Sequence, residues 1–342
     1  MTNKHSYCDY SIILDFLLQQ HLTGNIINNQ IKSELFFTGM ADMMIFLKNL
    51  ILMIILLCCQ QSFAADEEIL SLLAANKGKI DERISSVSEK LLGRPYMLLA
   101  LGEGANGQFN TRPLYRTDVF DCETFVDTVL AIVNSEDMPS FRQQINNIRY
   151  KHGKPNFFAR NHFTNLDWNM NNQKKAYIKD ITHNLQVYRT ARTYINKKNW
   201  YKHLQLNVII LHASDDEKKQ QLYRLRSLGY QNSSNAYSVL NYIPLSALFV
   251  EQRPVNSLFK QIPNGAIIEI VRPNWDLERT IGTKLDISHL GFAIWKDGNL
   301  YFRNASSIHN KIVDEKLSDY LQKYIHSPTV KGIHIEQPLA LL

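Results

Sequence analysis

A single cysteine stands directly before an apolar run in the stretch YRTDVFDCETFVDTVLAIV, residues 115–133. The apolar residues from Phe125 onward predict a strongly buried helix, with Asp121 as its N-cap and Cys122 in its first turn. Backbone N–H groups and the helix dipole favour an anion there, so we expect a lowered pKa for the Cys122 thiol. A thiol at the tip of a buried helix is suited to nucleophilic attack.

A thiol nucleophile needs a base that also protonates the leaving group, normally a histidine held by a third polar side chain. The stretch DISHLGFAIWKDGNLYFRNASS supplies a histidine in a rigid setting, because it predicts a β-hairpin with a two-residue turn at Asp297-Gly298. In that register His289 and Asn304 are diagonal neighbours on one face, within reach of a side-chain hydrogen bond. Asn304 would then hold one ring nitrogen and leave the other to face Cys122.

Taken one at a time, these signals have simpler explanations. A lone cysteine is more often a small buried hydrophobic residue than a nucleophile, and a histidine in a surface hairpin is usually incidental. The position of Cys122 at a helix start, together with a matching His289 and Asn304, favours the catalytic interpretation.

Helices and strands that would position these residues can be located from periodicity. Helical spacing of apolar residues predicts a helix at 80–91, and a second helix is predicted at 215–228. The apolar run LNVIILHA, residues 206–213, predicts a strand. Four further segments complete a small antiparallel β-barrel with a helix between its last strands: residues 262–271, the hairpin, residues 310–315 and residues 330–338, with the helix at 317–325.

The N-terminal region predicts export. Lys48 precedes an unbroken apolar run, residues 50–59, and small residues spaced for cleavage follow it. This order is typical of a secretory signal peptide, and the run is too short to span a bilayer. We expect a signal peptide at 40–65, cleaved after Ala64 or Ala65, and a start at Met40 with 1–39 as an upstream extension that is not translated. The alternatives are a tail before a membrane anchor, or a lipoprotein acylated at Cys58, which Leu57 disfavours.

Export changes the number of cysteines that the mature protein is expected to contain. Removing 65 of the 342 residues leaves 277, enough for one large domain or a domain with a substantial insertion. Three of the four cysteines leave with the N-terminus, and only Cys122 remains. Exported proteins usually pair their thiols, so a single remaining thiol is either buried or reactive. We expect a periplasmic protein, with secretion as the alternative.

Several stretches from about residue 91 to the C-terminus resemble a known superfamily when they are taken in order. The stretches are LGRPY, YMLLALGEGANGQFNTRPLYRTDVFDCETFVDTVLA, ARNHFTNLDW, NYIPLSALF, IPNGAIIEIV and HLGFAIWKDGNLYFRNASS. They are similar to the NlpC/P60 superfamily of papain-like cell-wall peptidases and amidases. More narrowly, they resemble its N-acetylmuramoyl-L-alanine amidase-like branch, formerly a family of unknown function.

The resemblance implies a fold and a set of catalytic roles. The fold would be α+β and papain-like, with an N-terminal helical half whose nucleophile helix packs on the small antiparallel β-barrel. Residues 66–342 would form one catalytic domain, with an inserted elaboration at about 170–261. By position, Cys122 matches the nucleophile, His289 the base and Asn304 the orienting residue. Superfamily members often have histidine at the last position, so Asn304 is a departure, though a chemically tolerable one.

The implied activity is that of a cysteine amidohydrolase acting on peptidoglycan or muropeptide fragments. It would cleave the amide between N-acetylmuramic acid and L-alanine through a thioester acyl-enzyme. The alternative within the superfamily is the D-glutamyl-diaminopimelate bond, and the residues alone do not separate the two. Hypotheses from other classes are a catalytically silent wall-binding protein and an acyltransferase that uses the same thiol.

Candidate substrate-binding residues come from the same pattern. The stretch ARNHFTNLDW would line the cleft with Arg160, His162, Asp167 and Trp168, although a packed turn is the simpler explanation. Two more candidates lie nearer the nucleophile. Arg116 would bind a peptide carboxylate, and the Tyr96 phenol would lie near the oxyanion or the sugar.

Cofactors and other partners are not expected. No Cys/His cluster has the spacing of a zinc site, and His162 with Asp167 lacks a third ligand in the sequence. The net charge of +6 suits polyanions, but no basic motif with interleaved stacking aromatics is present. We therefore expect a solvated basic surface, no nucleic-acid binding, no metal, and no stable membrane insertion after signal cleavage.

Overall fold

The computed structural model describes residues 45–49 and 65–341. Residues 45–49 form a short helix in the first of two units, and the second unit covers residues 62–342. The predicted extension at 1–39 and most of the predicted signal segment lie outside the described residues. Within the two described ranges, no helix is long and apolar enough to cross a membrane.

Helices and strands mix along the second unit, which begins with a helix at 65–74. The longer helices are α3 (Ile80–Lys90), α4 (Cys122–Val133), α5 (Met138–Arg149), α7 (Lys197–His203) and α8 (Asp215–Asn232). The shorter ones are α6 (Met170–Lys174), α9 (Leu245–Leu248), α10 (Asn256–Phe259), α11 (Glu278–Ile281) and α12 (Leu317–Gln322). A π-helical turn, η2, spans Thr164–Asn169.

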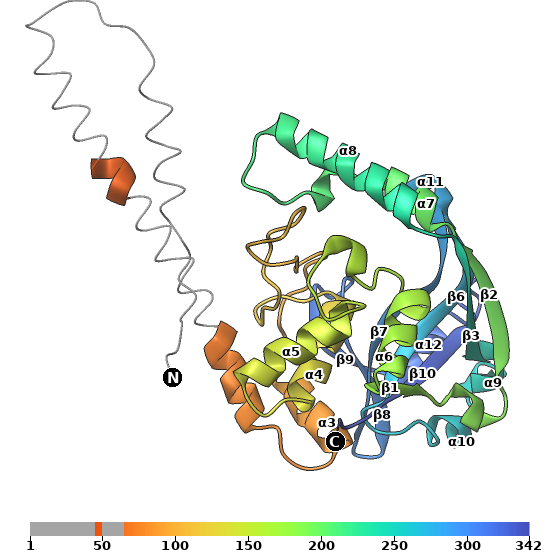
Figure 1. The fold of residues 1–342 in the computed structure, drawn as a ribbon. Coiled ribbons are helices and arrows are strands. Elements are labelled where there is room, and N and C mark those ends of the chain that lie inside the picture. The colour runs from red at the N-terminus through yellow and green to blue at the C-terminus, as the bar shows by residue number, and fades with distance from the viewer. Residues whose placement is uncertain (1–44, 50–64, 342) are drawn as a thin grey trace, which may run out of the picture. The chain divides into compact units, whose positions relative to one another are not determined.

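Ten strands are assigned in this unit. They are β1 (Ile178–Asp180), β2 (Arg189–Ile195), β3 (Ala236–Pro244), β4 (Phe249–Val250), β5 (Arg253–Pro254), β6 (Ile267–Leu277), β7 (Thr283–Lys296), β8 (Asn299–Ser306), β9 (Lys311–Lys316) and β10 (Gly332–Pro338). Eight of them form one antiparallel sheet in the order β2-β3-β10-β6-β7-β8-β9, with β1 paired to β10. Figure 1 shows helices α4 and α5 in front of the sheet, with α8 across the top and β2 along the right-hand edge.

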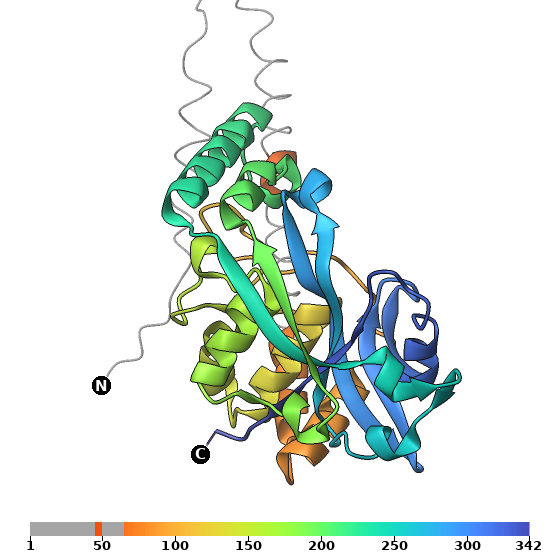
Figure 2. The ribbon, with the colours of Figure 1, turned by 90° about the vertical axis from the view of Figure 1, so that its right-hand side faces the viewer.

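The sheet is antiparallel, as expected, but it is open, so the predicted small β-barrel is corrected. Strands β2 and β9 end the hydrogen-bonded order, and they do not pair with each other. The long strands β6 and β7 instead continue past the centre of the sheet, and the β2-β3 ribbon packs across their far ends, as Figure 2 shows. Ala191 and Leu240 meet Val271 and Ile287 in a small apolar cluster there. Side-chain packing, rather than closed strand pairing, therefore holds this part of the sheet.

The two faces of the central sheet carry separate cores. Helices α3, α4 and α5 cover the face that bears Leu290 and Phe292, and Phe125 of α4 meets Phe292 edge to face with ring centroids 5.7 Å apart. The short helices α9, α10 and α12 cover the other face, where Phe302 is buried. Both cores are built from alternating positions of the same strands, which is the expected pattern for a sheet covered on both sides.

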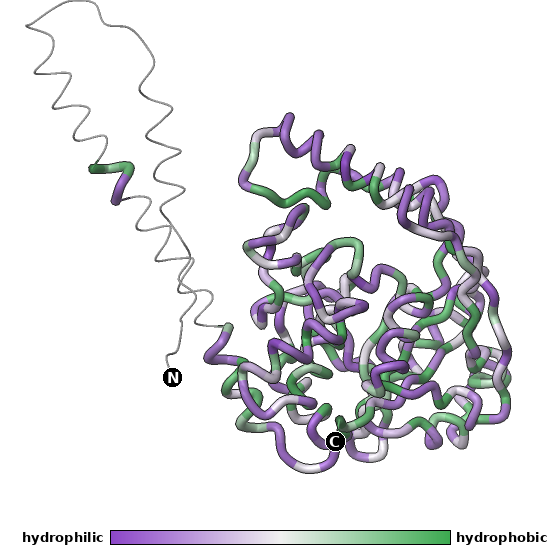
Figure 3. Tube along the Cα trace, viewed as in Figure 1, coloured by the Kyte–Doolittle hydropathy of each residue, from purple (hydrophilic) through white to green (hydrophobic). Residues whose placement is uncertain are grey.

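The predicted insertion at about 170–261 adds strands to the same sheet and a separate helical layer. Strands β1 and β3 pair with β10, while α8 packs on α7. Gly229 of α8 approaches Tyr201 so closely that a Cβ there would lie 2.0 Å from the tyrosine ring. Figure 3 shows that α8 is hydrophilic along most of its length. The predicted helix at 215–228 is confirmed, whereas the strand predicted at 206–213 is a 3-10 turn with one isolated bridge.

Candidate active site

Asp121 begins α4, as the sequence predicts. Its Oδ1 accepts from the Thr124 backbone N–H at 2.8 Å, and the Thr124 hydroxyl lies 2.9 Å from the Asp121 N–H. This reciprocal capping box fixes the first turn, and the apolar residues from Phe125 to Val133 anchor the rest of the helix in the core. Cys122 is consequently held in one position, partly exposed, at the start of a buried helix.

The predicted lowering of the Cys122 pKa is wrong. Burial raises the pKa of the Cys122 thiol, and the negative charges of Asp121 and Glu123 raise it further. Backbone hydrogen bonds at Leu290 and Glu123 act in the opposite direction but are outweighed. The carboxylate that caps the helix places a negative charge beside the thiol, so the benefit of the helix N-terminus is lost.

His289 on β7 and Asn304 on β8 are joined by the predicted hydrogen bond. The His289 Nε2 and Asn304 Oδ1 atoms are 2.9 Å apart. Lys296 pairs with Asn299 across the turn, as expected, and the pairing continues to Phe292 opposite Arg303. Asn304 is fully buried, so its side chain has little freedom to leave the histidine. The remaining ring nitrogen of His289, Nδ1, is left available to a reacting group.

A β-bulge lies next to His289, and the sequence reasoning missed it. Ile270 of β6 pairs with His289, but the next residue, Val271, pairs with Ile287, which leaves Ser288 as an extra residue. Bulges of this kind twist a strand locally and redirect a side chain. Gly291 adds to this arrangement, because a Cβ at that position would lie 2.9 Å from the Asn304 Cβ. Its lack of a side chain lets Asn304 approach β7.

His289 lies among aromatic rings. Tyr320 of α12 stacks over it with a centroid distance of 6.4 Å and an interplanar angle of 27°, and Phe302 meets it edge to face at 5.7 Å. Burial lowers the pKa of His289, against a smaller raising effect from the Asn304 hydrogen bond and the Glu315 charge. The pKa values of Cys122 and His289 therefore both favour the neutral thiol and the neutral imidazole. Sequence reasoning did not find Tyr320, since only the tertiary fold brings α12 here.

Packing brings Cys122 close to this part of β7. Cys122 packs against the same apolar core as Leu290, the residue that follows His289. Burial raises the pKa of Tyr320, the phenol that stacks on His289. The start of α4 therefore packs near the β7 bulge.

Tyr96 and Arg116 have different positions. Tyr96 lies beside the start of α4, and burial together with the Cys122 and Asp121 charges raises its pKa to about 12. It is therefore a neutral phenol next to the thiol. Arg116 instead forms an ion pair with the exposed Asp118, with 2.6 Å between Nε and Oδ1. Its guanidinium already has an acidic partner within the protein.

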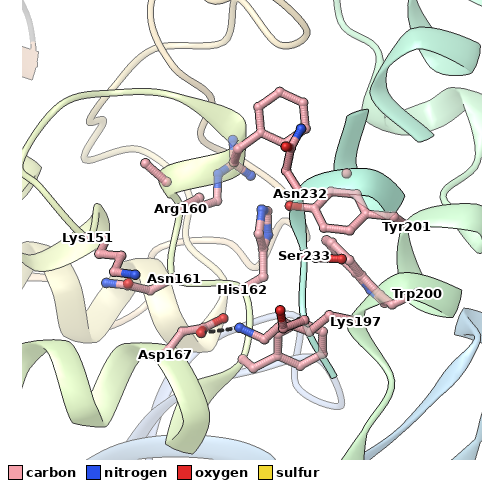
Figure 4. Close-up of a pocket in the computed structure, with 15 residues that line it drawn as sticks. Lys151, Arg160, Asn161, His162, Asp167, Lys197, Trp200, Tyr201, Asn232 and Ser233 are labelled. Atoms are coloured by element: carbon pink, nitrogen blue, oxygen red, sulfur yellow. Dashed lines mark hydrogen bonds and ion pairs between the residues drawn. The ribbon is translucent and has the colours of Figure 1, made fainter. Parts of the chain in front are cut away.

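A polar pocket of about 340 Å³ collects three of the four residues predicted from ARNHFTNLDW. Arg160, His162 and Asp167 line it together with side chains of α7 and the end of α8. In Figure 4, Arg160 stands opposite Trp200 and Tyr201, with His162 between them, and a dashed line joins Asp167 to Lys197. Arg160 also pairs with the buried Glu103 of the glycine-rich loop, residues 99–110.

His162 is a neutral side chain, and Trp168 is a core residue. Burial, with a smaller effect from the nearby Arg160 charge, lowers the pKa of His162 to about 3. Trp168 has no exposed surface, and its Nε1 donates to Asp127 at 2.7 Å. The prediction that Trp168 contacts substrate is therefore corrected. The indole anchors η2 to α4 and so positions its neighbour Asp167.

No group of three or more histidine, cysteine, aspartate or glutamate side chains in the described part of the chain is arranged to hold a metal ion. The reactive groups that the structure shows at the candidate site are a thiol, an imidazole and an amide, together with the phenols of Tyr96 and Tyr320.

Similarity to known proteins identifies the family of this chain. Residues 86–329 match the family described as N-acetylmuramoyl-L-alanine amidase-like. A crystal structure of a Legionella pneumophila protein of family DUF1460 is 44% identical, covering 82% of this chain and 96% of that one, with a TM-score of 0.80. An N-acetylmuramoyl-L-alanine amidase from Bacteroides uniformis is 23% identical, covering 76% and 99%, with a TM-score of 0.55. No curated protein matches.

The fold and site define a mixed α/β protein with an antiparallel sheet, a thiol at the start of its central helix, and a histidine–asparagine pair on the strands against which this helix packs. The chain belongs to the N-acetylmuramoyl-L-alanine amidase-like family.

Proposed function

We propose that the protein is a cysteine amidase that hydrolyses the amide between N-acetylmuramic acid and L-alanine in peptidoglycan or its fragments. The observation that carries the proposal is the hydrogen bond between His289 and the buried Asn304, beside a cysteine at a helix N-terminus. Membership of the amidase-like family supports cleavage of this amide bond. The hydrogen bond between His289 and Asn304 supports a mechanism with a cysteine nucleophile and a histidine base.

The proposed reaction starts from a neutral pair. His289 takes the thiol proton as the Cys122 sulfur attacks the carbonyl carbon of the lactyl group, and the Cys122 backbone N–H stabilises the oxyanion. His289 then passes the proton to the alanine nitrogen, and the C–N bond breaks to leave a thioester. Water attacks this thioester with His289 again accepting a proton, which releases the muramic carboxylic acid and regenerates the thiol.

The pocket lined by Arg160, His162 and Asp167 is proposed to hold a part of the substrate away from the scissile bond. Its aromatic and polar lining suits a sugar ring or a peptide with polar groups. The glycine-rich loop connects the two regions, since Leu99 bonds to Asp121 beside the nucleophile and Glu103 pairs with Arg160 at the pocket.

Defined muropeptides provide the test. We expect the purified protein to release an intact stem peptide that starts with L-alanine, as identified by product mass. Cys122→Ser should fold normally and lose turnover. A product cut between D-glutamate and diaminopimelate would favour the alternative bond, and transfer to an added amine would indicate an acyltransferase. An active Cys122→Ser variant would remove the cysteine mechanism.

Export and superfamily membership are parts of the same proposal. We expect a papain-like protein of the NlpC/P60 superfamily that works in the periplasm, where peptidoglycan lies. Sequencing of the exported protein should start at Ala65 or Asp66. A mature chain that retains residues 1–39 would contradict both the start at Met40 and the signal peptide.

A further inference from the structure

The β2-β3 ribbon packs against the long strands with one face, through Leu240, and exposes the other. On the exposed face, Tyr194 lies opposite Tyr237, and Arg192 lies opposite Val239. The two tyrosines and the valine have exposed fractions of 38%, 51% and 56%. Large apolar side chains gathered on one exposed face mark a contact with a partner or with a membrane.

Two lysines of α7 extend this face beyond the ribbon. Short connections join β2 to α7 and α8 to β3, so the helix pair continues from the end of the ribbon, as Figure 2 shows. Asn235 links the two parts, because its Nδ2 donates to the Tyr194 hydroxyl at 3.0 Å and its Oδ1 accepts from the Lys198 backbone N–H at 3.1 Å. The Nζ atoms of Lys198 and Lys202 lie 5.4 and 4.1 Å from the ring centroid of Tyr230, which is also exposed. We call the following side chains the basic-aromatic surface: Arg192, Tyr194, Lys198, Lys202, Tyr230, Tyr237 and Val239.

The cations of the basic-aromatic surface are not paired with acids. Arg192, Lys198 and Lys202 form no ion pair with a carboxylate of the residues that the structure describes. Arg192 instead lies over the Tyr237 ring, with its Cζ 3.6 Å from the ring centroid. Cation–π contacts at exposed positions are weak, so all three charges are available to an anionic partner.

We propose that the basic-aromatic surface docks the protein on a membrane that contains anionic phospholipids. Tyrosine is enriched where a membrane meets water, because its ring is apolar and its hydroxyl is polar. Lysine and arginine beside such rings attract the phosphate headgroups of anionic lipids. Both kinds of side chain share one exposed face here, and the cations have no competing carboxylate partner. The docking does not depend on the proposed amidase activity, so the two proposals can fail separately.

Binding to vesicles tests the proposal. Vesicles of phosphatidylglycerol and phosphatidylcholine are compared with vesicles of phosphatidylcholine alone in a co-sedimentation assay. The wild type should prefer the anionic vesicles, and added salt should weaken this binding. The triple variant Arg192→Gln/Lys198→Gln/Lys202→Gln should bind the anionic vesicles roughly 100-fold more weakly, about fivefold for each lost cation.

A triple variant at other exposed lysines, Lys77→Gln/Lys90→Gln/Lys260→Gln, is the matched control, because it removes the same charge from other elements. It should bind nearly as tightly as the wild type. Wild-type affinity in the variant of the basic-aromatic surface would overturn the inference. If that variant lost binding to purified peptidoglycan, and the wild type did not bind vesicles, the surface would belong to a wall polymer instead and the membrane proposal would be wrong.

A local probe distinguishes this surface from any other part of the chain that binds lipid. Tyr237→Trp places an indole within the basic-aromatic surface, and brominated phospholipids quench an indole only on close contact. The fluorescence that this variant adds to that of the wild type should be quenched by brominated anionic vesicles. Ile308→Trp is the control, because Ile308 is 73% exposed in the β8-β9 turn, at the other end of the strand order. Its added fluorescence should not be quenched. Unquenched fluorescence in Tyr237→Trp would exclude this face from membrane contact.

Discussion

The backbone N–H of Leu99 donates to Asp121 Oδ2 at 3.2 Å, while the other oxygen of the same carboxylate caps α4. Leu99 has a φ of 58°, a conformation that is uncommon for a residue other than glycine. One carboxylate therefore holds the start of the glycine-rich loop in an unfavourable conformation, fixes the nucleophile helix and places a negative charge next to Cys122.

Asp121→Asn should make the thiol more reactive. Asparagine is also a good N-cap, so the helix should remain, but the charge that raises the Cys122 pKa is removed. We expect a lower thiol pKa and faster alkylation by iodoacetamide at every pH below it. Loss of the Leu99 acceptor should cost about 1 kcal/mol in the free energy of unfolding.

Asp137→Asn is the control for that substitution, because Asp137 caps α5 by the same contact to Ser140, at 2.9 Å, without a cysteine beside it. It should leave the alkylation rate unchanged. An Asp121→Asn protein alkylated at the wild-type rate across the pH range would show that Asp121 does not set the thiol pKa.

Asn304→Ala should be less damaging than His289→Ala. A histidine without its partner still samples the working orientation, so kcat should fall while KM stays nearly constant. Asn304→His should recover much of the loss, since imidazole can also bond to His289. Steady-state kinetics with one muropeptide measure all three variants. If Asn304→Ala had wild-type kinetics while His289→Ala were inactive, another residue would orient the His289 ring. Ser306 would be the next candidate.

Variants in the polar pocket should change KM more than kcat. Asn232 is an exposed side chain of the pocket lining and Trp200 is a partly buried one. We expect Asn232→Ala and Trp200→Leu to raise KM severalfold, because they remove contacts made equally in the ground and transition states. Tyr223→Ala, an exposed aromatic of α8 that does not line the pocket, is the control. Unchanged KM in folded Asn232→Ala and Trp200→Leu would exclude the pocket from substrate binding.

Trp168→Phe should destabilise the protein without acting on chemistry directly. The indole N–H donates to Asp127, whose carboxylate also lies 3.8 Å from Arg149 in the core. Its loss leaves a buried acceptor with one fewer partner, at a cost of about 1–3 kcal/mol. Urea denaturation would measure this change. An unfolding free energy equal to that of the wild type would mean that the Asp127 contact is not stabilising.

His334 should contribute stability that depends on pH. Burial by itself lowers its pKa, but the Glu336 hydrogen bond at 3.0 Å and the Glu269 and Glu336 charges outweigh burial and raise the pKa to about 9. Protonation then favours the folded state. The contribution is fully present below the unfolded pKa of about 6.5 and is lost as pH rises through about 9.

Urea denaturation of wild type and His334→Gln across this range measures the effect. The difference between their unfolding free energies should shrink from pH 6.5 to pH 9. A difference that grows with pH would mean that His334 is neutral in the folded protein.

Local patterns in the sequence were sufficient to predict the nucleophile helix and the β7-β8 hairpin. The Asp121 cap and the apolar run predict α4 because both act within a few residues. The Asp297-Gly298 turn sets the β7-β8 register, and through it the contact between His289 and Asn304.

Features that depend on segments far apart in the chain could not be predicted from the sequence and became clear only from the tertiary structure. Burial and the charges around Cys122 raise its pKa although its helix position alone favours the thiolate, because desolvation depends on what packs around the sulfur. The Ser288 bulge, the Tyr320 stack and the open sheet have the same origin, since each depends on strands or helices that are far apart in the chain. Capping and turn chemistry are local and can be read from the residues, whereas strand closure and electrostatic environment are set by the packing of the whole chain.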